Sequence, residues 1–382
     1  KLEPKHKAAW NNLGRAYLGL GQTERAISAF QKQVEINPYD QYVYNNLGQA
    51  YERQAKYSEA IRQYQKQIEI NPLEPYAHGN LGRLYLGQKK FAEAVPELEK
   101  AVDLLPKNPV MQIELGQAYI GNNQTEKGMA AFEKAINLSP SPLVWNNIAY
   151  SLSEQNVQLD RAGQYADTAI NAIETQLRDV NLDSLRIQDL GTTQLLFAVW
   201  DTRGWIDFKR GNADGAERYI VPAWLAGGTG DEAEHLGEIA EKQGKREAAI
   251  RYYLLSLAAE NPSLDARARL NALGVKDVDR KAAEVRPQLQ RDRTVALNRN
   301  DRGTAEFYLL VGPGKVEQVK FIKGDDNLKS LADSLQKTDV GMKFPPEAHA
   351  HVVRRAVVSC GSGAPGPCRL ELLPTSRVRS LE

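Results

Sequence analysis

Apolar residues along the first 140 positions follow two spacings, one typical of helices and one of 34 residues. Trp10, Leu13 and Tyr17 lie at i, i+3 and i+7, which places them on one face of a helix. A Leu-Gly pair then recurs at a constant step, and a proline closes each stretch. The pairs begin at Leu13, Leu47, Leu81 and Leu115, and the prolines are Pro38, Pro72, Pro106 and Pro140. This period predicts pairs of antiparallel helices that stack around one continuous core.

Each recurring residue type has a physical role in such a helix pair. Gly14 and Ala26 have little or no side chain, so the two helices can approach closely. Gly21 suits the turn between them, and Pro38 ends the second helix. The pattern resembles the tetratricopeptide repeat over residues 7–140, in four repeats. This resemblance implies a mainly α fold, an α-α solenoid that winds into a superhelix.

The repeat becomes irregular beyond residue 140. A fifth repeat starts at Trp145, an interruption follows, and the pattern resumes near Trp200 and again near Leu236. We therefore predict repeats 1–5 over residues 1–178, an irregular insertion at 179–196, two degenerate repeats with a capping helix at 197–274, and a charged linker at 275–300.

The spacing of apolar residues changes again beyond residue 300. EFYLLVG and VEQVKFI, separated by GPGK, predict two strands joined by a tight turn. Leu328, Leu331 and Leu335 have helical spacing, and HVVRRAVVSC and CRLELLP are typical of two further strands. The order β-β-α-β-β predicts a small α+β domain at 301–380 after the helical repeats.

The segment from Gly303 to Pro346 resembles the C-terminal domain of the TonB family. The resemblance rests on a Gly-Lys-Val turn at Gly314 between two strands, on the Leu-rich helix, and on Lys-Phe-Pro from Lys343. The membrane anchor and Pro-rich spacer of that family are absent here, so energy transduction is not implied. The resemblance implies a small sheet whose edge could accept a strand from a partner.

Four positions of each repeat, beside the buried stripe, carry the candidate binding residues. When each repeat is numbered so that its Leu-Gly pair stands at positions 7 and 8, positions 2, 5, 6 and 9 share one flank of the first helix. Stacking is expected to bring this flank of successive repeats into one concave groove. The candidate peptide-binding residues are Asn11, Asn12, Arg15, Tyr42, Asn45, Asn46, Gln49, Tyr76, Asn80, Arg83, Gln117 and Asn147.

These residue types favour an extended peptide from a protein partner. An Asn amide can pair with both polar groups of a peptide backbone. Arg15 and Arg83 could hold a carboxylate, and Tyr42 and Tyr76 offer flat apolar area. Of the residues that clamp chaperone tails in related repeats, only Asn46 matches, so chaperone-tail binding is not predicted. Asn at position 6 is frequent in these repeats generally, and an inherited consensus without a ligand is the alternative.

The charge balance argues against a nucleic-acid partner, and the hydropathy of the chain argues against a membrane-spanning helix. Lys and Arg number 49 and Asp and Glu 48, a balance that argues against a nucleic-acid partner. No stretch approaches the roughly 18 consecutive apolar residues of a membrane-spanning helix. Because the chain starts within a repeat and without Met, we expect it to be a fragment of a longer protein.

Cys360 and Cys368 flank a Gly/Pro loop between two predicted strands and form a candidate disulfide. Two free thiols in a cytosolic protein are the alternative, whereas the TonB-like resemblance favours a disulfide in a periplasmic or secreted protein. The spacing excludes a Cys-x₂-Cys metal site, and His349 with His351 lacks a third ligand. We predict no metal, no cofactor and no catalytic residue.

The sequence thus predicts a non-enzymatic scaffold that binds a peptide or partner segment in the repeat groove. The alternative is the non-catalytic C-terminal region of a larger bacterial enzyme, with a transglutaminase- or peptidase-like domain upstream. In that case the repeats would position substrates or partners for the enzyme.

Overall fold

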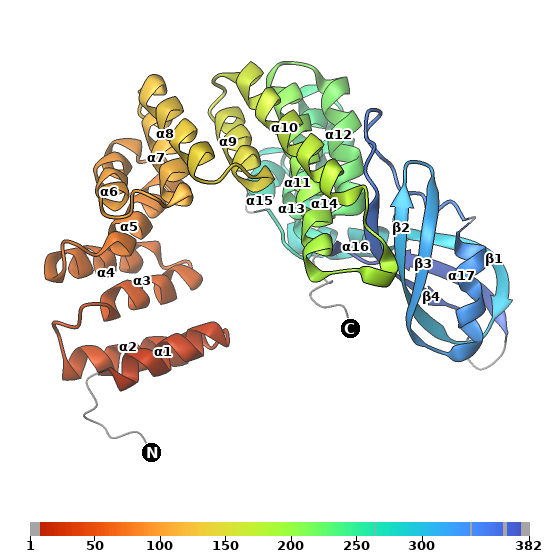
Figure 1. Cartoon of the computed structure of the whole chain (residues 1–382), viewed down its shortest axis with the longest axis horizontal. Coiled ribbons are helices and arrows are strands. Elements are labelled where there is room, and N and C mark those ends of the chain that lie inside the picture. Colours follow the sequence, from red (N-terminus) through yellow and green to blue (C-terminus); the bar gives the residue numbers. More distant parts are fainter. Residues whose placement is uncertain (1–7, 264, 337, 362–364, 376–382) are drawn as a thin grey trace. The chain divides into compact units, whose positions relative to one another are not determined.

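A computed structural model describes residues 8–263, 265–336, 338–361 and 365–375 of the chain (Figure 1). The outer ends of two predicted domains, residues 1–7 and 376–380, lie outside the described residues. The chain divides into an N-terminal unit, Lys1–Val144, and a C-terminal unit, Trp145–Glu382. Each unit is described by itself below.

The N-terminal unit consists, in its described residues, of successive helix pairs with the predicted 34-residue step. Within a pair the two helices contact each other, and α2, α4 and α6 each contact the first helix of the next pair. Its helices are α1 (Ala9–Gly19), α2 (Thr23–Ile36), α3 (Val43–Arg53), α4 (Tyr57–Ile70), α5 (Pro75–Gly87), α6 (Phe91–Leu104), α7 (Pro109–Gly121) and α8 (Thr125–Leu138), and α9 (Pro142–Glu154) begins in it.

The glycine of the recurring Leu-Gly pair is required by close helix packing. A Cβ atom at Gly82 of α5 would lie 2.5 Å from Cγ of Leu98 on α6, and one at Gly48 would lie 2.5 Å from the ring of Tyr64. Leu98 and Tyr64 are both fully buried. The large residue of the second helix therefore occupies the space that the missing side chain leaves.

Buried glutamines of the second helices bond to the first helices of the first two repeats. Gln33 of α2 accepts a hydrogen bond at Oε1 from the backbone N–H of Asn11 and donates from Nε2 to Asp40 at 2.8 Å. Asp40 in turn accepts from the first backbone N–H groups of the next helix, those of Tyr42 and Val43. Gln67 accepts from Asn45 N in the same way one repeat later. These bonds satisfy helix N-terminal donors that would otherwise be buried without a partner.

The C-terminal unit continues the helical pairs and adds a sheet. Its helices are α10 (Leu159–Leu177), a 3₁₀ turn at Leu182–Ser184, α11 (Ile187–Lys209), α12 (Ala213–Ala226), α13 (Gly230–Lys242), α14 (Arg246–Ala258), α15 (Asp265–Ala272) and α16 (Val278–Arg291). The predicted mainly α repeat fold with a small C-terminal α+β region is confirmed.

The predicted irregular insertion at 179–196 is in large part helical. From Ile187 onward it forms the first turns of α11, which runs without interruption into the sixth repeat. Asp189 accepts a hydrogen bond from the backbone N–H of Arg186 at this helix start. Buried Thr193 and Leu196 then continue the inward face of α11. The segment departs from the repeat because it lengthens one helix.

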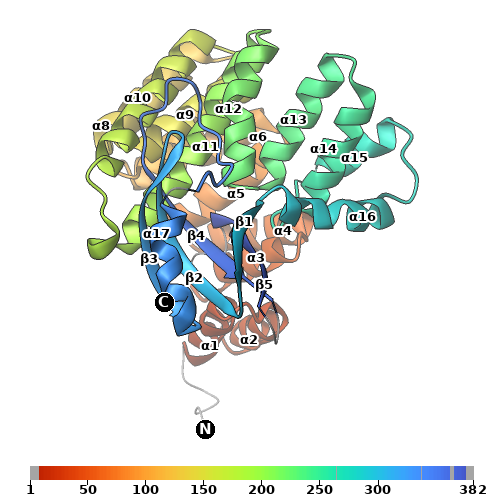
Figure 2. The ribbon, with the colours of Figure 1, turned by 90° about the vertical axis from the view of Figure 1, so that its right-hand side faces the viewer.

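The sheet has five antiparallel strands in the order β1-β5-β4-β2-β3 (Figure 2). The strands are β1 (Thr294–Asp301), β2 (Thr304–Gly312), β3 (Lys315–Gly324), β4 (Val352–Ser359) and β5 (Gly366–Leu372). A 3₁₀ turn at Asp326–Leu331 and the short α17 (Ala332–Leu335) replace the longer predicted helix. Strand β1 lies mostly in the predicted linker at 275–300. None of its residues is buried and it ends in polar residues, so the sequence did not indicate that it pairs with β5.

The sheet packs directly on the helices of the C-terminal unit. The backbone N–H of Val353 on β4 donates to Thr193 Oγ1 on the extended part of α11 at 3.3 Å. Arg354 is fully buried and donates to the carbonyl oxygens of Ala226 and Leu373. The lengthened α11 therefore provides a platform for β4, which explains why its first turns fit no repeat.

The structure joins Cys360, just after β4, to Cys368 on β5 by a disulfide. The two cysteines are eight residues apart. We expect the Cys360→Ser/Cys368→Ser double variant to lose about 2 kcal/mol of unfolding free energy, at the lower end of disulfide effects because the closed loop is short. Urea unfolding with and without reductant measures the loss. Reductant should destabilise the parent chain and leave the double variant unchanged, and a parent chain insensitive to reductant would contradict this expectation.

Candidate functional site

The first helices of successive repeats are joined through the asparagines at positions 5 and 6. Asn46 Nδ2 on α3 donates to Asn11 Oδ1 on α1 at 2.8 Å, and Asn80 Nδ2 on α5 donates to Asn45 Oδ1 on α3 at 3.0 Å. Positions 5 and 6 of neighbouring repeats are therefore adjacent, and the first helices form one continuous surface within the N-terminal unit.

The two asparagines at position 5 have a structural role in this surface. Asn11 and Asn45 are buried, with 7% and 8% of their surface exposed. Their backbone N–H groups donate to Gln33 and Gln67, and their side-chain oxygens accept from the next repeat. Their amides already make contacts that a peptide backbone would otherwise make. Both remain predicted peptide ligands, but the hydrogen bonds explain their presence without one.

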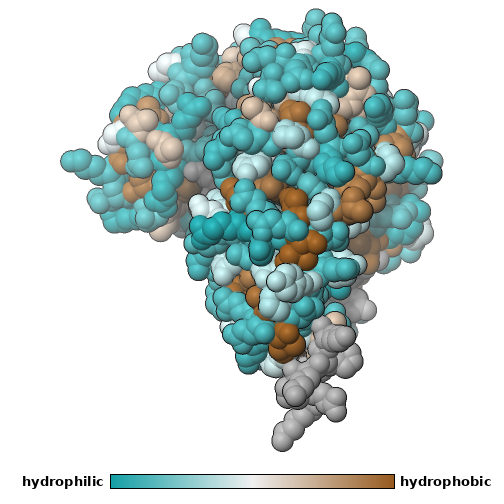
Figure 3. Space-filling model, turned by 90° about the vertical axis from the view of Figure 1, so that its left-hand side faces the viewer, coloured by the Kyte–Doolittle hydropathy of each residue, from teal (hydrophilic) through white to brown (hydrophobic). Residues whose placement is uncertain are grey.

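Position 2 carries exposed apolar side chains in four successive repeats. Their exposed fractions are 54% for Tyr42, 54% for Tyr76, 57% for Val110 and 54% for Leu143. We call these four residues the apolar ladder. On the face shown in Figure 3, apolar residues form separate patches among hydrophilic ones, and scattered exposed apolar residues are ordinary on protein surfaces. The ladder differs because its members occupy the same position of consecutive repeats.

A charged cluster lies on the same first helices. Arg83 Nη2 contacts Glu52 Oε2 at 2.7 Å, and Glu52 also accepts from the Tyr64 hydroxyl at 3.0 Å. Burial raises the pKa of the Glu114 carboxyl to about 7, Arg83 opposes this rise, and Glu52 adds to it. Arg83, a predicted carboxylate ligand, is thus already paired, and a peptide carboxylate would have to compete with Glu52.

The remaining predicted residues differ in accessibility. Asn12 and Arg15 are exposed, and Gln49 and Gln117 are half-buried. Asn147 is half-buried and belongs to the C-terminal unit, apart from the other eleven.

Sequence reasoning missed three residues of this surface. Val110 and Leu143 stand at position 2 and Glu114 at position 6, so the repeat numbering itself would have placed them there. These repeats carry Val, Leu and Glu where other repeats carry Tyr and Asn, so a pattern of recurring residue types does not include them.

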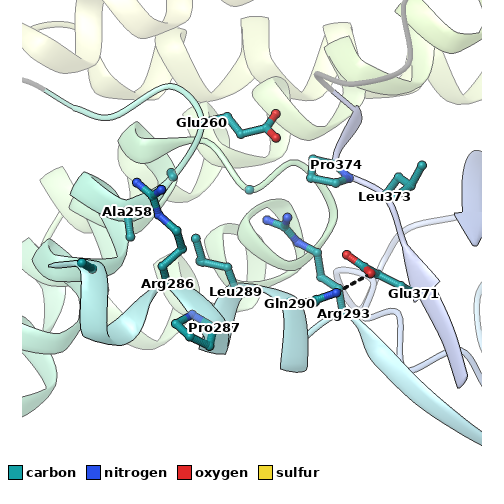
Figure 4. Close-up of a pocket in the computed structure, with 13 residues that line it drawn as sticks. Ala258, Glu260, Arg286, Pro287, Leu289, Gln290, Arg293, Glu371, Leu373 and Pro374 are labelled. Atoms are coloured by element: carbon teal, nitrogen blue, oxygen red, sulfur yellow. Dashed lines mark hydrogen bonds between the residues drawn. The ribbon is translucent and has the colours of Figure 1, made fainter.

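A pocket of about 690 Å³ lies elsewhere, within the C-terminal unit, beside α16 and the end of β5 (Figure 4). Its lining carries both signs of charge, with Arg286 and Arg293 beside Glu260 and Glu371. Gln290 Nε2 donates to Glu371 at 2.7 Å, the bond drawn in Figure 4. Because charges of both signs face this pocket, it selects no class of charged ligand.

The described residues contain no cluster of three or more His, Cys, Asp or Glu side chains arranged to hold a metal ion. In the same part of the chain, every helix is too short or too polar to cross a membrane.

Comparison with known families identifies the repeats. Tetratricopeptide-repeat family models match residues 8–72, 45–109, 85–149 and 234–267. The matched regions end before the sheet, so the TonB-like resemblance stays a prediction. A search of curated proteins found no match.

Among the solved structures to which the chain is similar, one with a TM-score above 0.5 shows the same kind of fold. A tetratricopeptide repeat protein from Parabacteroides merdae is 14% identical, with 74% of this chain and 98% of that chain covered and a TM-score of 0.51. MamA from Desulfovibrio magneticus RS-1 is 22% identical over 44% of this chain and 96% of its own, with a TM-score of 0.41. The pilF protein of Pseudomonas aeruginosa is 21% identical over 57% and 90%, with a TM-score of 0.40.

Proposed function

We propose that this chain, whose residues 8–149 and 234–267 are tetratricopeptide repeats, is a non-enzymatic scaffold that binds an extended segment of a protein partner along the apolar ladder. The observation that carries the proposal is the exposure of four apolar side chains at one position of consecutive repeats. A regular row of half-exposed tyrosine and aliphatic side chains suits a binding surface, because tyrosine buries large apolar area and keeps a polar end.

The distance expected between packed helices suggests what kind of segment would fit the ladder. Packed helices lie about 8–10 Å apart, and a polyproline II segment returns to the same face every three residues, about 9 Å along its axis. A partner segment with an apolar side chain at every third residue would therefore meet successive members of the ladder. The Glu52–Arg83–Glu114 cluster beside the ladder makes an acidic partner less suitable than a neutral one.

A peptide-display experiment tests this proposal. Random peptides displayed on phage are selected against the whole chain, and we expect enrichment of apolar residues three apart. Binding of a selected peptide is then measured by fluorescence polarisation for the parent chain and for Tyr42→Ser and Tyr76→Ser. Each substitution should weaken binding about tenfold, since burying one such side chain contributes roughly 1–2 kcal/mol.

The matched control is Tyr57→Ser, because Tyr57 is 45% exposed but lies on α4, a second helix. It should leave the affinity unchanged. Unchanged binding in both ladder variants, or an equal loss in Tyr57→Ser, would overturn the proposal. Ladder variants are preferred to Asn46→Ala or Asn80→Ala, because these would also remove hydrogen bonds between repeats.

The C-terminal sheet offers a second contact in this proposal. Strands β1 and β3 are its edges, and an exposed strand edge is where a partner strand can add. This is the role that the TonB-like resemblance implies, and it stays a prediction beside the ladder.

A further inference from the structure

A second pocket, of about 260 Å³, lies within the C-terminal unit. Seven of its lining residues stand at the repeat positions that form the candidate binding surface of the first repeats. Position 2 supplies Ala198 and Asp231, position 5 Asn146 and Asp201, position 6 Thr202 and His235, and position 9 Tyr150. The volume is below the range typical of small-molecule sites and suits a single side chain.

Negative groups outnumber positive ones around this pocket. Its lining contains the carboxyl groups of Asp201, Asp231 and Glu232 and one side chain that can be cationic, His235. Nδ1 of His235 lies 2.9 Å from Asp201, and the imidazole stacks on Trp205 with ring centroids 4.0 Å apart. His235 is therefore engaged by Asp201, which leaves Asp231 and Glu232 without a cation in the lining.

Burial and the neighbouring carboxyl group of Asp201 both act on the pKa values of groups around this pocket. Burial lowers the pKa of His235, but Asp201, together with Glu234 and Glu154, raises it to about 9. Burial raises the pKa of Asp231, with His235 opposing and Asp201 adding to the rise. Burial also raises the pKa of Glu232 well above its ordinary range, which nearby Asp201 reinforces and the Thr229 hydrogen bonds and Arg293 oppose.

Asn146 supplies an independent sign of a missing hydrogen-bond donor. Its side chain lines the pocket, the residue is only 8% exposed, and its Oδ1 has no hydrogen-bond partner among the described residues. A buried acceptor without a partner is costly, and native structures usually satisfy it with a ligand or water. The pocket therefore combines an unsatisfied acceptor with carboxylates, and both favour a cationic donor.

We propose that this pocket binds the charged end of a lysine or arginine side chain from a protein partner. Such a group donates hydrogen bonds to Asn146 and Asp231, and its charge compensates the carboxylates. The Tyr150 ring beside them offers the flat face on which cations pack. A metal ion fits less well, because the described residues include no arrangement of side chains suited to hold one. The pocket is independent of the apolar ladder and stands if the ladder binds nothing.

The test is a titration of the whole ¹⁵N-labelled chain followed by NMR. The probes are Nα-acetyl-arginine amide and Nα-acetyl-lysine amide, with the citrulline and norleucine analogues as neutral matches. We expect a charged probe at millimolar concentration to shift the amide signals of Tyr150, Thr202 and Asp231. The neutral match should bind at least about tenfold more weakly. The arginine and lysine arms show which head group the pocket prefers.

Two variants and a control test whether Asp231 and Asn146 bind the probe. Asp231→Asn should weaken the charged probe about tenfold. Asn146→Leu should abolish binding and raise the thermal unfolding midpoint, because it removes an unsatisfied acceptor. A purely structural Asn146 would instead lower the midpoint. Asp179→Asn, an exposed aspartate outside the pocket, should change neither binding nor stability.

Three outcomes would overturn the proposal. The first is equal binding of charged and neutral probes, and the second is the absence of shifts at these residues with either charged probe. The third is a response to calcium chloride at the same residues without a response to the amides, which would make the pocket a metal site.

Discussion

Leu98→Ala is expected to lower the unfolding free energy of the N-terminal repeats by about 2–5 kcal/mol, the range for emptying a fully buried leucine site. Leu98 is wholly inaccessible and its side chain fills the space above Gly82. Gly82→Ala alone should cost about 1–3 kcal/mol, because the new methyl group would overlap Leu98 Cγ, an atom that cannot move without shifting the whole side chain. Urea unfolding followed by circular dichroism measures both.

The Gly82→Ala/Leu98→Ala double variant tests whether Gly82 is needed because of Leu98. In the Leu98→Ala background the overlap is gone, so Gly82→Ala should become neutral or stabilising, as alanine replaces glycine in a helix interior with a gain of up to about 1 kcal/mol. Gly87→Ala is the control on the same helix α5, since nothing lies within 4 Å of a Cβ placed there. Additive costs in the double variant would show that the glycine is needed for a reason other than Leu98.

Glu114→Gln is expected to stabilise the chain at pH 8 by up to about 3 kcal/mol, and to have little effect near pH 4.5. Burial raises the pKa of Glu114 from 4.5 in the unfolded chain to about 7 in the folded one. The folded state therefore binds more protons than the unfolded state between these values. Stability from this group is present at low pH and is lost as pH rises through 7, whereas the neutral glutamine keeps it.

The measurement is the difference in unfolding free energy between variant and parent at pH 5 and pH 8. Taking this difference cancels the other titrating groups that both proteins share. Glu35→Gln serves as the control, because Glu35 is an exposed glutamate on α2. A Glu114→Gln effect that is equal at both pH values would contradict the shifted pKa.

The sequence predicted where the residues of the candidate surface lie on the helices, but not which hydrogen bonds and ion pairs they make. The repeat period placed Asn11, Asn46 and Tyr42 on one flank of the first helices, because helical periodicity depends on local sequence alone. It did not reveal that Asn46 donates to Asn11, since that bond joins residues 35 positions apart. Nor did it find the pairing of Arg83 with Glu52, which depends on how two first helices lie side by side.

The sequence by itself determined the helix pairs and their 34-residue step, because this period reflects contacts between adjacent segments of the chain. Only the tertiary structure shows that residues 187–196 are helical and that residues 294–301 form strand β1. Both are stabilised by partners far along the chain, β4 for the first and β5 for the second. The spacing of apolar and polar residues within a segment does not indicate which distant segment it will contact. The acidic pocket has the same origin, since packing of three repeats and burial together create its unsatisfied acceptor and its surplus of carboxylates.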